Sequence, residues 1–225
     1  MFSLNVWLAI PSYTGQIHIA TMRSLLKDYV SFKDRGDSVT VYDECGSALI
    51  ADARAEIVAK FLASDADTLI FIDNDVAWEA GAALRLADHP VDFVSGIYPM
   101  RKDPIEYSVS WDQTKAELWA DPDTGLLEVD AVPAGFMKMS RRMLEKMVTH
   151  YRCELEHYSK NAPDDTAWAL FDPYWEGDKK FGEDYSFCKR WRAMGEQVWI
   201  DPDIDMAHVG LKTFVGNLAN YLRGR

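Results

Sequence analysis

Two carboxylates one residue apart, Asp73 and Asp75, follow directly after a short and fully apolar run at residues 69–72. A run of this kind is typical of a strand buried on both faces, as in a parallel sheet. Ligands of open α/β sheets lie at the carboxyl ends of strands. Two acids placed there repel each other and lose hydration, and a divalent cation with oxygen ligands relieves both costs. The segment Asp73-Asn74-Asp75 therefore predicts a site for a metal-bound phosphate ligand.

Arg54 lies on the apolar face of a predicted helix, four residues from both Ile50 and Val58. A guanidinium that faces the sheet needs a partner, because an unpaired buried charge is costly. Two interpretations are open. Arg54 contacts a phosphate or the Asp73-Asn74-Asp75 segment, which a planar fork suits, or it forms a structural ion pair with Asp73 or another core acid.

Asp184 is also a charged residue on the inward face of a predicted helix, later in the chain. It lies three and four residues before Phe187 and Cys188, so its side chain faces inward in the first turn. An acid in the first turn complements the helix dipole, but Glu183 can do so from a more exposed position. An inward acid beside a long polar segment suits a general base or a hydroxyl-binding group.

His208 follows a late predicted strand and a run of acids. It could fold back toward the acidic segment, where an imidazole and two carboxylates make a reasonable manganese site, or it could be an ordinary surface or core histidine. The acids before it, Asp201, Asp203 and Asp205, are interpreted as a solvated turn. The other histidines, His18, His89, His150 and His157, show no ligand spacing and are interpreted as surface residues.

Three further residues stand at predicted strand ends on the same edge as Asp73. Asp43 ends the second strand, and its carboxylate can accept hydrogen bonds from a nucleobase N–H or a ribose hydroxyl. The alternative is a turn residue, a common use of aspartate. Pro11 and Tyr13 end the first strand, and Tyr13 could stack on a base.

Composition sets the wider limits. The chain has 225 residues, 48% of them hydrophobic and 27% charged, which fits one soluble domain with a sizeable core. No apolar stretch approaches the roughly 18–20 residues that cross a membrane, and residues 1–10 are expected to form a first strand rather than a signal peptide. Three widely spaced cysteines favour a reducing cytoplasm over a disulfide framework. The formal charge of −12 makes nucleic acid an unlikely partner, although a local basic strip could still bind it.

The first half of the chain alternates strand-like and helix-like patterns. Such alternation predicts right-handed βαβ units and a mainly parallel sheet. The expected strands are residues 6–10, 39–42, 68–72 and 91–98, and the expected helices are residues 17–30, 49–62 and 79–87.

The second half is less regular. Residues 156–180 are polar and aromatic, and a loop this long is usually a functional lid or a disordered segment. Ser140 is the expected N-cap of one helix and Gly195 the expected C-cap of another. The expected strands are residues 107–111, 116–119, 127–132 and 197–200, the expected helices are residues 140–148 and 183–194, and residues 211–222 form a weakly amphipathic tail.

Taken in order, these elements resemble the GT-A glycosyltransferases. The resemblance covers about residues 5–210 and is closest to family-2-like enzymes, with features of the fungal mannan-polymerase mannosyltransferases. The elements that carry it are the strand end at residues 9–13, Ala53-Arg54 on a helix, Asp73-Asn74-Asp75 as a DxD motif, residues 132–139 as the stretch lining donor sugar and acceptor, residues 182–188 as the "ED" helix, and residues 201–208 with a final histidine.

The resemblance implies an α/β fold with a single GT-A-type domain over residues 1–225. Its mainly parallel nucleotide-binding sheet would be flanked by helices, and a smaller mixed or antiparallel part would lie on the acceptor side. The nucleotide-binding half would cover residues 1–100, the acceptor-side half residues 101–210, and a C-terminal tail residues 211–225.

The implied function is metal-dependent transfer of a hexose from a UDP- or GDP-sugar to a hydroxyl of a glycan or other acceptor. A UDP-sugar is the more expected donor. Asp75 and His208 would bind Mn²⁺ or Mg²⁺, with Asp73 on the metal or the ribose, and the metal would neutralise charge on the leaving diphosphate. Asp184, with Glu183 beside it, would be the base of an inverting reaction or would position a sugar in a retaining one. The donor nucleotide would contact Pro11, Tyr13, Asp43, Arg54, Asp73 and Asn74, and the sugar or acceptor would contact Gly135, Phe136 and Trp175.

Two other functions are compatible with the residues. Asp-Asn-Asp-Val also fits a loose motif of haloacid-dehalogenase-type phosphatases, in which the first aspartate is the nucleophile. That motif usually follows the first strand, whereas two strands are expected before Asp73 here. The other alternative is a non-catalytic protein that binds a sugar or nucleotide.

Overall fold

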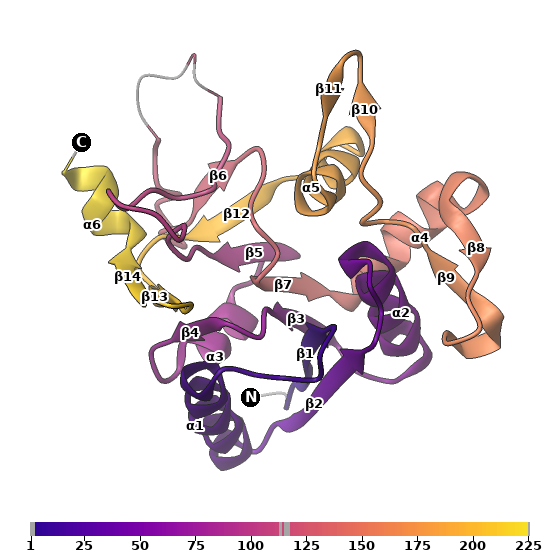
Figure 1. Cartoon of the computed structure of the whole chain (residues 1–225), viewed down its shortest axis with the longest axis horizontal. Coiled ribbons are helices and arrows are strands. Elements are labelled where there is room, and N and C mark those ends of the chain that lie inside the picture. Colours follow the sequence, from indigo (N-terminus) through magenta and orange to yellow (C-terminus); the bar gives the residue numbers. More distant parts are fainter. Residues whose placement is uncertain (1–2, 113, 115–117, 225) are drawn as a thin grey trace.

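A seven-stranded sheet forms the centre of the computed structural model, which describes residues 3–112, 114 and 118–224 (Figure 1). The strand order is β2-β1-β3-β7-β5-β12-β6. The strands are β1 (Asn5–Ser12), β2 (Ser38–Cys45), β3 (Thr68–Ile72), β5 (Phe93–Gly96), β6 (Leu127–Val129), β7 (Phe136–Ser140) and β12 (Val198–Asp201).

Most of this sheet is parallel. Strands β2, β1, β3, β5 and β12 point the same way, while β7 and β6 are antiparallel to their neighbours. Every residue of β3 is buried, as its unbroken apolar run predicts for a strand covered on both faces. The predicted α/β fold with a mainly parallel sheet is confirmed.

Helices cover both faces of the sheet. One core lies between the sheet and α2 (Ile50–Ala63), α4 (Arg141–Leu155) and α5 (Glu183–Ala193), around buried rings such as Phe71 and Phe187. The other lies against α1 (Ile19–Arg35) and α3 (Ala82–Asp88). The predicted N-cap is confirmed, since the Ser140 hydroxyl accepts a hydrogen bond from the Met143 amide at 3.1 Å. The predicted C-cap is one residue off: Met194 caps α5, and Gly195 follows it with φ +82°.

A small second sheet has the order β14-β13-β4. It consists of β4 (Val76–Trp78), β13 (Asp205–His208) and β14 (Phe214–Asn217), and the short helix α6 (Leu218–Arg223) follows β14. The segment Asp73-Asn74-Asp75 connects β3 of the large sheet to β4 of the small one. The two acids therefore stand where the sheets meet.

Residues 156–180 form regular structure rather than the expected long loop. They contain the hairpins β8 (Glu156–Tyr158) with β9 (Thr166–Trp168) and β10 (Trp175–Glu176) with β11 (Lys179–Lys180), and the short helix η1 (Pro163–Asp165). The buried carboxylate of Glu56 on α2 accepts hydrogen bonds from Ser159 at 2.9 Å and Asn161 at 3.2 Å. These contacts fasten the first hairpin to the body of the protein.

Other predicted boundaries also differ. The strand expected at residues 107–111 is reduced to isolated bridges at Tyr107 and Ser110. Of the strand expected at residues 116–119, residues 116 and 117 lie outside the described part of the chain. The tail at residues 211–222 is divided between β14 and α6. Across the described ranges, no helix is both long and apolar enough to span a membrane.

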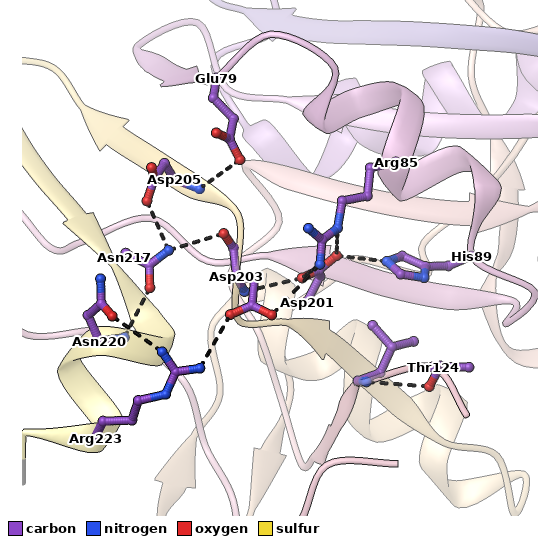
Figure 2. A network of polar contacts seen from close by, with 11 residues as sticks. Glu79, Arg85, His89, Thr124, Asp201, Asp203, Asp205, Asn217, Asn220 and Arg223 are labelled. Atoms are coloured by element: carbon purple, nitrogen blue, oxygen red, sulfur yellow. Dashed lines mark hydrogen bonds and ion pairs between the residues drawn. The ribbon is translucent and has the colours of Figure 1, made fainter. Parts of the chain in front are cut away.

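The predicted solvated turn is wrong for Asp201, which is 1% exposed (Figure 2). Arg85 donates hydrogen bonds to its two oxygens at 2.6 and 2.8 Å, and a ring nitrogen of His89 lies 2.7 Å away. His89 is thus a partner of this carboxylate and not a free surface residue. Asp203 and Asp205 are exposed, as expected. The Asp201 contacts join α3 to the end of β12.

Candidate functional site at the junction of the two sheets

Asp73 occupies the first position after β3, beside the antiparallel strand β7. Ile72 pairs with Phe136, and the Asp73 amide donates a hydrogen bond to the carbonyl of Gly135 at 2.9 Å. The hydroxyl of Tyr98, which follows β5, donates to Asp73 Oδ2 at 3.3 Å. Backbone register therefore brings residues from three strands together at one carboxylate.

Gly135 allows this close approach. A Cβ atom built on Gly135 would lie 2.5 Å from both Asp73 Oδ2 and the Tyr98 hydroxyl. No side chain fits there without displacing one of these groups. Gly135 thus leaves room for the Asp73 carboxylate, and its contact with a sugar or acceptor stays a prediction.

Arg54 bridges two acids from distant parts of the chain. Its guanidinium donates to Asp73 Oδ1 at 3.1 Å and to Glu183 Oε1 at 2.7 Å, and Arg54 is 2% exposed. Burial opposes its charge, but Asp73 and Glu183 outweigh this effect and raise the pKa of Arg54. The expected partnership with Asp73 is confirmed, and Arg54 also connects α2 to the start of α5.

Asp75 and His208 face each other across the small sheet. His208 pairs with Val76 in the β4–β13 register, and the Val209 amide donates to the Asp75 carbonyl at 2.8 Å. His208 Nε2 lies 3.5 Å from Asp75 Oδ1, while its Nδ1 lies 3.0 Å from the carbonyl oxygen of Pro99. With a proton on Nε2 the ring donates to Asp75, whereas with the proton on Nδ1, donated to the Pro99 carbonyl, Nε2 would be free for a cation.

A cation also contacts Asp75. The Arg101 guanidinium donates to Asp75 Oδ2, whereas His208 lies near the other oxygen, Oδ1. Burial disfavours the ionised carboxyl, but hydrogen bonds from His208 and Arg101 prevail and lower the pKa of Asp75. Asp75 is therefore held as a carboxylate between a histidine and an arginine.

The predicted Mn²⁺ or Mg²⁺ site can be tested on this geometry. Asp75 offers a carboxylate, and His208, in the tautomer with its proton on Nδ1, offers Nε2 at 3.5 Å from Asp75 Oδ1, a pair that suits either metal. Asp73 is turned toward Arg54 and Tyr98, and no group of three metal-ligating side chains is assembled among the described residues. Two protein ligands with phosphate oxygens and water make an adequate Mg²⁺ site, so the residues fit a cation that arrives with its ligand.

Asp184 lies in the first turn of α5, next to Glu183. Its Oδ1 accepts a hydrogen bond from the Tyr185 amide at 2.7 Å, and no ion pair to Asp184 occurs in the described part of the chain. Burial and the neighbouring charge of Glu183 raise the pKa of Asp184 to about 6. A carboxyl poised near neutrality in a partly buried position has the properties of a general base.

A cavity of about 240 Å³ lies beside the ends of β1 and β2, against α1. Asp43 and Cys45 of β2 line it together with Ser12 of β1. Asn74 donates hydrogen bonds to two of the residues that line it, to the Ser12 hydroxyl at 3.2 Å and to the Gln16 carbonyl at 2.9 Å. Asn74 therefore shapes the loop after β1, and Asp43 presents its carboxylate in the cavity.

The other residues predicted to contact the donor or acceptor differ in how exposed they are. Pro11 is buried at the end of β1, while Tyr13 is 66% exposed beside it. The ring of Phe136 is fully buried, with its centroid 4.8 Å from that of Trp78, so it supports the sheets and offers no surface to a ligand. Trp175 is 64% exposed on the β10–β11 hairpin, which projects from the body near α5 (Figure 1).

Two residues of the site were missed by the sequence analysis, Tyr98 and Arg101. Tyr98 follows the parallel strand β5, and its position at a strand end was a usable signal. Arg101 lies in an irregular segment, and no periodicity or motif connects it to Asp75. Only the packing of that segment against the turn after β13 reveals the contact.

The fold is of the α/β class and is GT-A-like. No protein-family model matches the sequence, and no curated protein sequence is significantly similar to it. Among solved structures, the chain is similar to A197 from STIV, with 18% identity, a TM-score of 0.55 and 95% of both chains covered. It is also similar to GalNAc-T7 crystallised with UDP, GalNAc and Mn²⁺, with 11% identity and a TM-score of 0.50 over 92% of this chain and 44% of that one.

Proposed function

We propose that the protein is a glycosyltransferase that uses a nucleoside-diphosphate sugar and a divalent cation. The observation that carries the proposal is the Asp75–His208 pair at the junction of the two sheets, two residues from Asp73, which Arg54 connects to the start of α5 and its acid Asp184. The GT-A-like fold supports it, since a structure of similar fold holds UDP, GalNAc and Mn²⁺.

The nucleoside of the donor would occupy the cavity at the ends of β1 and β2. Asp43 would accept a hydrogen bond from a base N–H or a ribose hydroxyl, and Tyr13 would cover the base. Asp73 would bind the ribose or the cation, while Asp75 and His208 would hold the cation beside the diphosphate. When bound, Mn²⁺ or Mg²⁺ supplies Lewis-acid stabilisation of the departing diphosphate.

The transfer step would use Asp184. The acceptor hydroxyl oxygen forms a bond to the anomeric carbon, the bond from that carbon to the diphosphate oxygen breaks, and the electron pair leaves with the nucleoside diphosphate. Asp184 takes the hydroxyl proton. A single displacement of this kind inverts the anomeric configuration. Arg54 holds Asp73 and Glu183 in place and thus keeps the donor and acceptor sides of the site together.

The phosphatase alternative requires Asp73 as a free nucleophile. Asp73 instead accepts hydrogen bonds from Arg54 and Tyr98, which hold both of its oxygens. A phosphoaspartate trapped on Asp73 would favour that alternative. A non-catalytic binding protein would show ligand binding without any turnover of the donor.

A thermal-shift panel of UDP-, GDP-, CMP- and dTDP-sugars, with and without Mn²⁺, tests the proposal. We expect one nucleotide class to raise the melting temperature only when Mn²⁺ is present, because ligand that binds the native state alone stabilises it. Release of the nucleoside diphosphate is then measured with the best donor. No shift with any donor would contradict the proposed function, and a shift without release would leave only the binding role.

A further inference from the structure

Arg101 contacts the very carboxylate that the proposed function assigns to the cation. It lies in the segment that connects β5 to the residues near β6, and its side chain packs over Gly210 in the turn after β13. A Cβ atom on Gly210 would lie 3.5 Å from Arg101 Cδ and Nε. The guanidinium and His208 thus approach Asp75 from two directions.

The backbone around Arg101 is held independently of this contact. The Met100 amide donates to the Glu106 carbonyl at 2.8 Å, and Lys102 forms an ion pair with the Glu106 carboxylate. Asp103 forms an ion pair with Lys212 of the turn after β13. The backbone hydrogen bond and the bridge between Pro99 and Tyr107 hold this segment, whereas the two exposed ion pairs add little. The Arg101 side chain can therefore leave Asp75 while its backbone stays in place.

A divalent cation at Asp75 Oδ1 and the Arg101 guanidinium at Oδ2 would compete for the same negative charge. A divalent cation on the Asp75 carboxylate would repel a guanidinium hydrogen-bonded to the same group. The Arg101 side chain is 42% exposed, and ion pairs with this exposure hold their partners only weakly. A bound cation would therefore repel Arg101 from Asp75, and the exposed ion pair would oppose this only weakly.

We propose that Arg101 is a positioning residue that exchanges Asp75 for the donor diphosphate when the cation binds. This inference rests on the proposed function. With a cation bound at Asp75, the donor phosphate oxygens would lie beside that carboxylate, where the displaced Arg101 guanidinium could donate to them. The planar fork of arginine matches two oxygens of a phosphate, which the single ammonium of a lysine does not. Before the donor arrives, Arg101 neutralises Asp75 in a chain whose formal net charge is −12.

The test measures metal and nucleotide binding by calorimetry for the wild type, Arg101→Ala and Arg101→Lys, with Lys102→Ala as the matched control. Lys102 is the next residue and pairs with Glu106 rather than with Asp75. Mn²⁺ is first titrated alone, and UDP and GDP are then titrated at saturating Mn²⁺. Melting curves confirm that each variant is folded, which the exposure of Arg101 favours.

Exchange predicts opposite changes in the two titrations. Arg101→Ala should bind Mn²⁺ alone about two- to fivefold more tightly, because an exposed ion pair competes by no more than that. It should bind the nucleotide at least tenfold more weakly, because a hydrogen bond to a charged group is lost. The Mn²⁺ and nucleotide affinities of Arg101→Lys should lie between those of the wild type and Arg101→Ala. Lys102→Ala should match the wild type in both affinities.

Each contrary outcome has a definite meaning. Unchanged or weaker Mn²⁺ affinity in Arg101→Ala would overturn the exchange, and so would unchanged nucleotide affinity. If the wild type binds Mn²⁺ but no nucleotide, the proposed function fails, whereas the titration with Mn²⁺ alone still decides whether Arg101 competes for Asp75.

Discussion

His208 Nε2 lies 3.5 Å from Asp75 Oδ1, although one residue follows β3 and the other ends β13. The β4–β13 register produces this contact, because His208 pairs with Val76 directly after the acid. The carbonyl of Pro99 fixes the other ring nitrogen at 3.0 Å. The pair is thus positioned by backbone contacts on both sides, which is the arrangement that a metal-binding histidine needs.

Gly135→Ala is expected to disrupt donor binding. Its Cβ would lie 2.5 Å from Asp73 Oδ2 and the Tyr98 hydroxyl, so one of these groups must move. We expect a loss of about 1–3 kcal/mol in the free energy of unfolding, as for other overpacked sites, together with weaker nucleotide binding. Urea denaturation and calorimetry measure the two effects. Gly224→Ala, whose nearest contact would be an ordinary 3.5 Å, is the control, and equal behaviour of both variants would contradict the steric role.

Arg54→Met should destabilise the protein. The substitution keeps much of the side-chain volume but leaves Asp73 and Glu183 without their shared partner. Breaking a fully buried pair costs about 3–5 kcal/mol, and the partial exposure of both carboxylates reduces the expectation to roughly 2–3 kcal/mol. The exposed Arg152, paired with Glu156 within one helix turn, serves as the control, and Arg152→Met should cost less than about 1 kcal/mol. Equal urea midpoints for the two variants would refute the bridging role.

The pH dependence of transfer should follow Asp184. A base works only when ionised, and the pKa of Asp184 is raised to about 6, first by burial and then by Glu183. The kcat/KM profile should therefore fall as the pH drops through about 6. Asp184→Asn should bind the donor and lose transfer.

Glu183→Gln provides a sharper check on the same pKa. It removes the negative charge beside Asp184 and should move the acidic limb of the profile to lower pH. A limb that stays in place, or an Asp184→Asn variant with wild-type turnover, would remove Asp184 as the base.

Acid should weaken the fold through Asp201. Burial disfavours its charge, but His89 and Arg85 prevail and lower the pKa of Asp201. A carboxyl with a depressed folded pKa contributes stability above its unfolded pKa and loses it as the pH falls toward the folded value. Asp201→Asn should cost roughly 2–3 kcal/mol near neutral pH and flatten this acid dependence, because a buried charge pair is broken. Asp203→Asn, at an exposed position, should retain wild-type dependence, and a flat profile in the wild type would contradict the argument.

The sequence predicted best where local pattern decides the structure. The sequence predicted the bounds of β3 because a strand buried on both faces is an unbroken apolar run. Because Arg54 lies on an apolar helix face, the sequence predicted that it pairs with an acid. Asp73 is one of its two acidic partners. The spacing of apolar residues predicted that Asp184 lies in the first turn of a helix, which is confirmed, while its role as a base stays a prediction.

The sequence predicted least where distant segments meet. Strand β7 begins directly after Gly135 and inserts antiparallel between β3 and β5, which an alternating strand–helix pattern does not indicate. Asp201 resembled a turn residue because its partners Arg85 and His89 lie on and just after α3. Arg101 reaches Asp75 only through packing of an irregular segment. Local periodicity carries no information about such contacts.

Calorimetry of UDP and GDP with the wild type and Asp75→Ala, each with and without Mn²⁺, tests the central claim most directly. The account predicts that the wild type binds one of these nucleotides in a Mn²⁺-dependent manner and that Asp75→Ala loses this dependence while keeping the wild-type fold. Equal Mn²⁺-dependent affinity in both proteins, or no binding of either nucleotide to the wild type, would contradict it.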